Sequence, residues 1–157
     1  MPANTSDDGW RQTHLGRLAE RARQRFDTRV LTLMAHDDEL TLSLSHLAAR
    51  GTLSASHIQI TRHLQQQGCR LTELAELAGI TKQAMGKLVD QCAAWGLVER
   101  QADPRDARAV QIMFTTTGLQ WLSAYRQAVE QAEAEFRQAV GPEVATVVQL
   151  GLEAYVA

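Results

Sequence analysis

The sequence has little lysine and little cysteine, and it has no long apolar run. Only two of its 16 basic residues are lysines, Lys82 and Lys87, and both fall in the single stretch "ITKQAMGKLVD". The two cysteines, Cys69 and Cys92, lack the CxxC spacing of zinc sites and thioredoxin-like redox motifs. Because no apolar stretch reaches the length of a signal-peptide core or a membrane span, we expect a cytoplasmic protein with no membrane partner.

The charge of the chain is close to neutral, which excludes a generally basic nucleic-acid binder. The 157 residues carry a formal net charge of −2, so a nucleic-acid site would have to come from the local placement of basic side chains. Apolar residues make up 45% of the chain and charged residues 22%, which is typical of a globular protein. The length suits a single domain, residues 1–157.

Most of the sequence has the apolar spacing of helices, and its three prolines leave room for long ones. Residues 10–50 are predicted to be mostly helical, and residues 116–157 to form two helices separated by Gly141 and Pro142. Between these flanks, capping residues and helix-ending glycines predict three shorter helices. The expected N-cap residues are Ser54 or Ser56, Thr72, Thr81 and, for the long helix that follows, one of residues 115–117.

Residues 97–114, "LVERQADPRDARAVQIMF", change to the pattern of a β-hairpin. Two apolar-rich arms flank the centre "ADPRDAR", whose proline and aspartates are turn residues. The predicted fold class is therefore mainly α with one β-hairpin.

Residues 71–90, "LTELAELAGITKQAMGKLVD", fit a helix-turn-helix. Two helices that meet at a steep angle need a small residue where their backbones touch, and Ala75 is suitably placed. The sharp turn needs a residue that tolerates positive φ, which Gly79 provides. The expected core of the motif is Leu74, Ala75, Gly79, Ile80, Met85 and Leu88, with Met85, Leu88 and Cys92 as the inward stripe of the second helix.

The second helix of this motif would direct a polar face outward. Glutamine can pair bidentately with adenine, lysine can donate to guanine or phosphate, and a glycine lets a helix approach a base pair closely. An ordinary solvated helix presents the same kind of face, and the helix alone does not decide between the two. The outward positions are Lys82, Gln83, Gly86, Lys87 and Asp90, and the candidate recognition residues are Thr81, Lys82, Gln83, Ala84, Gly86 and Lys87.

A helix-turn-helix followed by a short hairpin is a winged helix, and this combination favours DNA recognition. The tip of such a hairpin can reach the minor groove, where arginine is favoured electrostatically. The candidate wing residues are Arg105, Asp106 and Arg108, and we expect Asp106 to hold the Arg108 guanidinium in position. The alternative is a surface turn with a weak ion pair.

Residues 71–122 resemble the MarR family of bacterial winged-helix transcription regulators. The resemblance rests on the capped helix-turn-helix, on "AWGLVER" as the family's GLVxR step, on "DPRDAR" as its DPxDxR wing tip, and on "FTTTG" as the start of the next helix. It implies a winged helix-turn-helix at residues 54–114 and dimerisation helices at residues 10–53 and 116–157. It also implies a homodimer that binds double-stranded DNA at a palindromic operator. One departure is Ala107, because relatives often have arginine there.

The resemblance further implies a small-molecule effector, often a phenolic or other aromatic acid, bound between the dimerisation helices and the winged helix. Six arginines between residues 11 and 29 could meet an anionic ligand, phosphates or a partner subunit, although scattered solvation explains them as well. No cysteine precedes Cys69, which argues against the cysteine-based peroxide sensing of some relatives. The run "HDDE" at residues 36–39 is interpreted as a solvated helix end rather than a metal site, and no cofactor is expected.

Two functions from different classes stay open. The first is a DNA-binding transcription regulator that acts as a repressor and is released from its operator by a ligand. The second is a winged-helix module that binds protein and lacks specific DNA recognition. The shared direction of the two lysines, Gln83 and Arg108 favours the first, whereas the five basic and four acidic residues between positions 81 and 108 leave only a modest field. An enzyme is least favoured, because no nucleophile–base pair, phosphate loop or metal spacing is visible.

Overall fold

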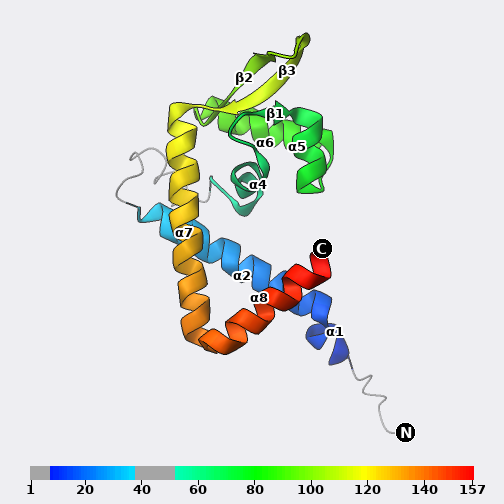
Figure 1. Cartoon of the computed structure of the whole chain (residues 1–157), viewed down its shortest axis with the longest axis vertical. Coiled ribbons are helices and arrows are strands. Elements are labelled where there is room, and N and C mark those ends of the chain that lie inside the picture. Colours follow the sequence, from blue (N-terminus) through cyan, green and yellow to red (C-terminus); the bar gives the residue numbers. More distant parts are fainter. Residues whose placement is uncertain (1–7, 38–51) are drawn as a thin grey trace, which may run out of the picture.

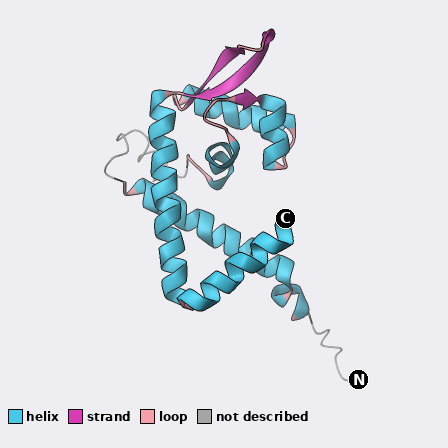
Figure 2. Ribbon diagram, in the orientation of Figure 1, coloured by secondary structure: helices cyan, strands magenta, loops and turns pink. Residues whose placement is uncertain are grey.

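The computed structural model of the chain describes residues 8–37 and 52–157, and these form a mainly helical structure with one small sheet (Figures 1 and 2). The long helix α7 runs from the sheet to the far end of the molecule, where α8 turns back (Figure 1). Residues 38–50 of the region that was predicted to be mostly helical lie outside the described residues. In chain order the elements are α1 (Trp10–Thr13), α2 (Leu15–Ala35), α4 (Ala55–His63), β1 (Cys69–Arg70), α5 (Leu71–Ala78), α6 (Lys82–Ala94), β2 (Val98–Asp103), β3 (Asp106–Phe114), α7 (Thr116–Val140) and α8 (Pro142–Val156).

The predicted hairpin is confirmed, and it belongs to a three-stranded antiparallel sheet with the strand order β1-β3-β2. Strands β2 and β3 form the projecting wing (Figure 2). Cys69 belongs to β1, where it pairs with Ile112. Gly68, at φ +84°, completes the turn one residue earlier.

The sequence correctly placed the N-caps of three helices. Ser54, Thr81 and Thr115 occupy the N-cap positions of α4, α6 and α7. The hydroxyl oxygens of Thr81 and Thr115 accept hydrogen bonds from the backbone N–H groups of Ala84 and Gly118, at 3.1 and 2.9 Å. Such a cap satisfies one of the unpaired N–H groups at a helix start and stabilises the helix by about 1 kcal/mol.

The N-cap expected at Thr72 was wrong. Strand β1 runs directly into α5, so the helix begins at Leu71 and Arg70 takes the N-cap position. The carboxylate of Glu73 accepts the backbone N–H of Arg70 at 2.9 Å, which is the second half of a capping box. The strand therefore determines where this helix starts.

One hydrophobic core joins the winged helix to the long helices. Trp121 of α7 and Met34 of α2 are fully buried against residues of α4, α5, α6 and the sheet. Two ion pairs add to this core. The buried Asp27 of α2 pairs with Arg62 of α4, and Arg29 of α2 pairs with Glu135 of α7 near the surface. The winged helix is thus attached to the long helices by both apolar and charged contacts.

The start of α7 lies unusually close to the chain that leads into the wing. The backbone N–H of Thr115 donates to the carbonyl of Leu97 at 3.1 Å. A Cβ added at Gly118 would lie 1.8 Å from the same carbonyl oxygen, so only glycine fits at this position. This contact gives a physical reason for the glycine of "FTTTG", because it lets α7 begin directly against the base of the wing.

Helix α8 has an apolar face that the core does not cover. Six of its apolar side chains expose at least half of their surface, namely Val144, Val147, Leu150, Leu152, Tyr155 and Val156. Near the other end of the described chain, Trp10 and Leu15 are also more than 60% exposed. Exposed apolar side chains gathered on one helix often mark an interaction site. None of the described helices is both long enough and apolar enough to cross a membrane.

Candidate nucleic-acid interface

Helix α6, the second helix of the helix-turn-helix, has one buried and one exposed face. Met85, Val89 and Cys92 are completely buried. Their spacing of four and three residues follows the helical period. Leu88, which was expected in this stripe, is half-buried and packs against the core at the edge of the stripe, whereas Val89 was not singled out in the sequence. The face opposite to this stripe is therefore the one that a partner can reach.

The exposed face carries most of the candidate recognition residues. Thr81, Lys82, Gln83, Ala84 and Lys87 are all exposed, and they fall in the first two turns of α6. Neither Lys82 nor Lys87 forms an ion pair with any residue in the described parts of the chain.

Gly86 lies at the edge of the exposed face of α6. Gly86 is half-buried, and a Cβ added there would touch only the side chain of Leu71, at 3.8 Å. The expectation that Gly86 points fully outward is therefore corrected. The position borders α5, and ordinary van der Waals contact would accommodate a methyl group.

The turn between the two helices has the expected geometry. Leu74 and Ala75 are buried, and Gly79 ends α5 in the left-handed conformation, at φ +66°. The backbone N–H of Ile80 donates to the carbonyl of Ala75 at 3.1 Å, and the Ile80 side chain is half-buried. These contacts fix the angle at which α6 leaves α5.

The wing tip is anchored by a residue that the sequence did not single out. The side chain of Asp103 is fully buried, and its carboxylate accepts the backbone N–H of Arg105 at 2.9 Å and the Nε–H groups of Arg70 and Arg105 at 3.1 and 3.3 Å. The backbone hydrogen bond from Arg105 and the two guanidinium groups lower the pKa of Asp103. An aspartate just before a proline is a turn signal, but its arginine partner at position 70 is not visible in the local sequence.

Asp106 has a different role from the one predicted. Its carboxylate accepts the backbone N–H of Arg108 at 3.1 Å and lies 3.7 Å from the guanidinium of Arg70. The expectation that it holds the Arg108 guanidinium was wrong, because the side chain is turned toward Arg70. Arg108 has no carboxylate partner within ion-pairing distance among residues 8–37 and 52–157, so its guanidinium is available to a ligand.

The arginines of the first long helix are largely engaged within the chain. Asp27 is buried and accepts hydrogen bonds from Arg62 at 2.8 Å and from Arg23 at 3.1 Å. Arg29 forms a bidentate pair with Glu135, with both N···O distances at 2.7 Å. Hydrogen bonds from Arg29 lower the pKa of Glu135 to about 2. These arginines thus serve first to hold the helices together.

The cysteines and histidines offer no reactive centre in the described parts of the chain. Burial raises the pKa of Cys92 to about 12, and burial also raises the pKa of Cys69. Thiols of this kind are poor nucleophiles and poor metal ligands at neutral pH. No group of three or more histidine, cysteine or acidic side chains is close enough to hold a metal ion within the described ranges, which include His36 and Asp37 but not residues 38–39.

The fold and this surface define a winged helix-turn-helix protein. The wing follows an exposed second helix, and long helices flank both on the N-terminal and C-terminal sides. Comparison with known proteins confirms, for the winged helix-turn-helix, the resemblance seen in the sequence, because the model of the MarR family matches residues 52–109.

Solved structures share the fold over nearly the whole chain. The transcriptional repressor CouR bound to a 23-mer DNA duplex is 20% identical, with 96% of this chain and 97% of that chain covered and a TM-score of 0.66. The reduced form of MarR from E. coli is 24% identical, with 90% and 96% covered and a TM-score of 0.68. CouR from Rhodococcus jostii RHA1 bound to p-coumaroyl-CoA is 18% identical, with 92% of both chains covered and a TM-score of 0.67. No curated protein matches the sequence.

Proposed function

We propose that the protein is a homodimeric transcription regulator that binds a palindromic DNA operator through α6 and the wing. The observation that carries this proposal is that Lys82 and Lys87 lie on the exposed face of α6 with no ion-pair partner among the described residues, within a fold shared with a repressor bound to DNA. An exposed helix of this kind fits the major groove, which is wide enough to admit it. In the proposed arrangement, residues 54–114 bind DNA, whereas residues 10–53 and 116–157 form the dimer.

The roles of the α6 residues follow from their chemistry. Gln83 would read adenine through a bidentate hydrogen bond, and Ala84 would contact a thymine methyl group. Lys82 and Lys87 would bind guanine or phosphate, and Thr81 at the helix start would lie against the phosphate backbone.

The wing would contact the neighbouring minor groove. Arg108 is the stronger candidate, because its guanidinium has no carboxylate partner in the described chain. Arg105 is already hydrogen-bonded to Asp103, and DNA would have to compete for the remaining N–H groups. With Ala107 in place of a further arginine, the wing would contribute few phosphate contacts.

The exposed apolar face of α8 supports the dimer. A two-fold dimer would place its two recognition helices in successive major grooves, with half-site centres about 34–36 Å apart. A small anionic or aromatic effector bound between the dimerisation helices and the winged helix would change this separation. The protein would then leave the operator, so in the proposed function it is a repressor when no effector is bound. The CouR structure with p-coumaroyl-CoA is an example of a protein of this fold with a ligand of that kind.

The test is DNA binding by fluorescence anisotropy, with duplexes selected from a random-sequence library. On the proposed DNA-binding surface of each subunit, Lys82, Lys87 and Arg108 have no carboxylate partner among the described residues. They predict about six phosphate contacts per dimer and a slope of log K against log salt of about −5. The variant Lys82→Ala/Lys87→Ala should lose specific binding and retain a slope of only about −2. The control Arg126→Ala/Arg137→Ala removes the same number of charges from α7 and should bind like the wild type, with the dimer checked by sedimentation.

A second candidate function, a protein-binding winged helix, is favoured by the modest charge of this surface. Between positions 81 and 108 the negative charges of four acidic residues offset most of the positive charge of five basic residues. If library selection enriches no sequence, and the lysine variant binds DNA as weakly as the wild type, the DNA-binding proposal is wrong and this second function takes its place.

A further inference from the structure

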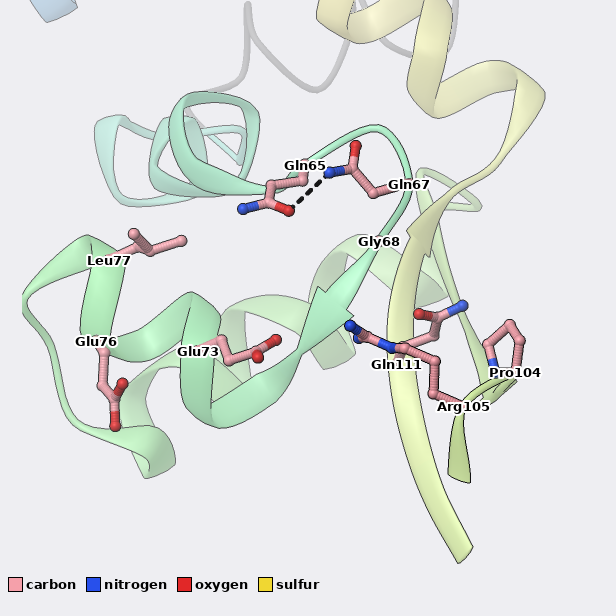
Figure 3. A pocket seen from close by; sticks show the side chains of 9 residues that line it. All are labelled: Gln65, Gln67, Gly68, Glu73, Glu76, Leu77, Pro104, Arg105 and Gln111. Atoms are coloured by element: carbon pink, nitrogen blue, oxygen red, sulfur yellow. Dashed lines mark hydrogen bonds between the residues drawn. The ribbon is translucent and has the colours of Figure 1, made fainter. Parts of the chain in front are cut away.

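Helix α6 has to be held at a fixed angle if its side chains are to read DNA, and one side of the helix-turn-helix is open. A groove of about 730 Å³ separates α5 from the tip of the wing (Figure 3). In Figure 3, Glu76 and Leu77 of α5 lie on one side of this groove, and Pro104 and Arg105 of the wing lie on the other. The helix-turn-helix and the wing tip therefore do not support each other across this opening, so the contacts of α6 with α4 become important for its orientation.

The side chain of His57 makes a polar contact between α4 and α6. The residue is only 5% exposed. Its Nε2 atom lies 2.7 Å from Oε1 of Gln91, a residue of α6 that is 34 positions further along the chain. Its ring also packs against the ring of Trp95, with the centroids 4.8 Å apart and the planes inclined at 54°. Nothing in the local sequence singles out this histidine, because both of its α6 partners are distant in the chain.

The start of α4 fixes the position of this imidazole. His57 is the third residue of the helix, and its Nδ1 atom lies 3.0 Å from the backbone nitrogen of Ser54, the N-cap residue. Because a backbone N–H can only donate, Nδ1 accepts this hydrogen bond and the ring proton is assigned to Nε2. Nε2 therefore donates to Gln91, whose amide oxygen can only accept. The same ring thus completes the capping box of α4 and holds α6.

Gln91 and Trp95 lie one turn apart on α6. Residues four positions apart in a helix lie on the same side, with about 6 Å between them along the axis. Here that side is the flank between the buried stripe and the exposed face of α6. Two contacts at different heights along one flank restrict both the rotation of α6 about its axis and its tilt. A single contact would leave one of these motions free.

Small changes of tilt matter at the other end of the helix. Gln83 is eight residues from Gln91, which is about 12 Å along the helix axis. A tilt of about 5° about Gln91 would move Gln83 by about 1 Å. The side chains of a binding site have to be held within about 0.5 Å of their working positions. Contacts in the C-terminal half of α6 can therefore decide whether its first two turns fit the base edges.

We propose that His57 is a positioning residue of the recognition helix. The cap of α4 holds its imidazole, and the imidazole holds the C-terminal half of α6 through Gln91 and Trp95. This contact sets the angle at which Lys82 and Gln83 meet DNA, although His57 itself touches no base. The inference rests on the proposed DNA binding and names a residue that controls its sequence selectivity.

The test compares specific with non-specific DNA affinity. The full chain is titrated against a duplex that the wild type selects from a random-sequence library, and against a scrambled duplex of the same length and composition. Gln91→Met removes the acceptor for Nε2 and leaves the cap of α4 intact, whereas His57→Phe removes both nitrogens and keeps a ring against Trp95. Each should lower the ratio of the two affinities by at least about fivefold, which corresponds to one lost base contact. Binding to the scrambled duplex should stay unchanged, since the basic residues remain.

Three further variants separate positioning from general stability. Gln91→Glu keeps an oxygen for the Nε2–H and should retain the wild-type ratio. The double variant His57→Phe/Gln91→Met should show no larger loss than His57→Phe alone, because both changes remove the same contact. Val30→Ala makes a cavity in the core at α2 and should lower the Tm without changing the ratio.

Hydrogen exchange measured without DNA gives a second readout. Gln91→Met should speed the exchange of the backbone amides at residues 88–95 by about fivefold, the factor for one net hydrogen bond, while the amides of α7 keep their wild-type rates. Val30→Ala should not show this selectivity for α6.

The positioning role is wrong if Gln91→Met retains the wild-type ratio, or if Val30→Ala lowers the ratio as much as His57→Phe does. Unchanged exchange in α6 of Gln91→Met would also overturn it, because the contact would then hold nothing in place. A wild type that selects no DNA sequence is a different outcome, since it refutes the proposed function and, with it, any role of His57 in recognition.

Discussion

Replacing a helical glycine by alanine should change the free energy of unfolding in opposite directions at Gly86 and at Gly118, because their surroundings differ. Alanine is favoured over glycine in a helix by about 1 kcal/mol, and this preference applies at both positions. At Gly86 an added Cβ would meet only the Cδ2 of Leu71, at 3.8 Å. At Gly118 it would lie 1.8 Å from the carbonyl oxygen of Leu97 and 2.9 Å from the carbonyl carbon, which are backbone atoms and cannot rotate away.

The expected stabilities follow from these contacts. Gly86→Ala should raise the free energy of unfolding by about 1 kcal/mol, which corresponds to a Tm increase of roughly 2–4 °C in a chain of this size. Gly118→Ala should cost about 3 kcal/mol through overpacking. After the helix preference is subtracted, the net loss is about 2 kcal/mol, or a Tm decrease of roughly 4–8 °C.

Thermal unfolding followed by circular dichroism at a fixed protein concentration measures both shifts, because the Tm of an oligomer depends on concentration. Shifts of the same sign, or an unchanged Tm for Gly118→Ala, would refute the argument that backbone contact at Leu97 requires a glycine. Gly86→Ala also bears on the proposed recognition: if α6 approaches DNA closely at this position, the variant should be more stable and yet bind DNA more weakly.

Three further predictions concern buried or paired groups. The hydrogen bond from the backbone N–H of Arg105 lowers the pKa of Asp103. Protection of the wing from hydrogen exchange should therefore be full above the usual aspartate pKa and should be lost as the pH falls through the lowered pKa. The variant Asp103→Asn should reduce this protection at neutral pH, while the helical circular dichroism signal stays unchanged. Arg29 lowers the pKa of Glu135 to about 2, so the stability contributed by this pair should be lost only as the pH falls from the usual glutamate range toward 2, and Glu135→Gln should flatten an acid unfolding curve there. Burial raises the pKa of Cys92 to about 12, so a thiol reagent at neutral pH should modify it no faster than the protein unfolds, and fast modification in the folded state would contradict its burial.

Much of the winged helix could be predicted from local signals. The N-caps at Thr81 and Thr115 and the left-handed Gly79 depend on residues within a few positions of each other, and all three are present in the structure. The hairpin has the same local character, with a proline and aspartates between its two arms. Helix α6 was placed correctly as well, but the stripe was assigned to Leu88 instead of Val89. Between Met85 and Cys92, spacings of three then four residues and of four then three residues both fit one helix face, so the period alone does not choose between these neighbours.

The rest depends on contacts between residues far apart in the chain. Strand β1 is two residues long and exists because β3 pairs with it, so no periodicity could reveal it. Its presence moves the start of α5 from Thr72 to Leu71. The anchor of the wing joins Asp103 to Arg70, which are 33 positions apart. A sequence pattern identifies the turn that contains Asp103, but only the folded chain shows that a guanidinium from β1 reaches it.

The arginines and lysines of the winged helix have different roles, which follow from the geometry of their side chains. Arg70, Arg100 and Arg105 each hold a carboxylate of the winged helix, and a planar guanidinium suits this task because it can bind in a fixed, two-pronged geometry. Lys82 and Lys87 have no such partner in the described chain and stay on the exposed face of α6. An ammonium group on a flexible stem acts as a point charge, which suits a partner that arrives from solution, such as a phosphate. Three of the four acidic residues between positions 81 and 108, namely Asp90, Asp103 and Asp106, thus lie beside arginines of the fold, and the two lysines stay available to DNA in the proposed complex.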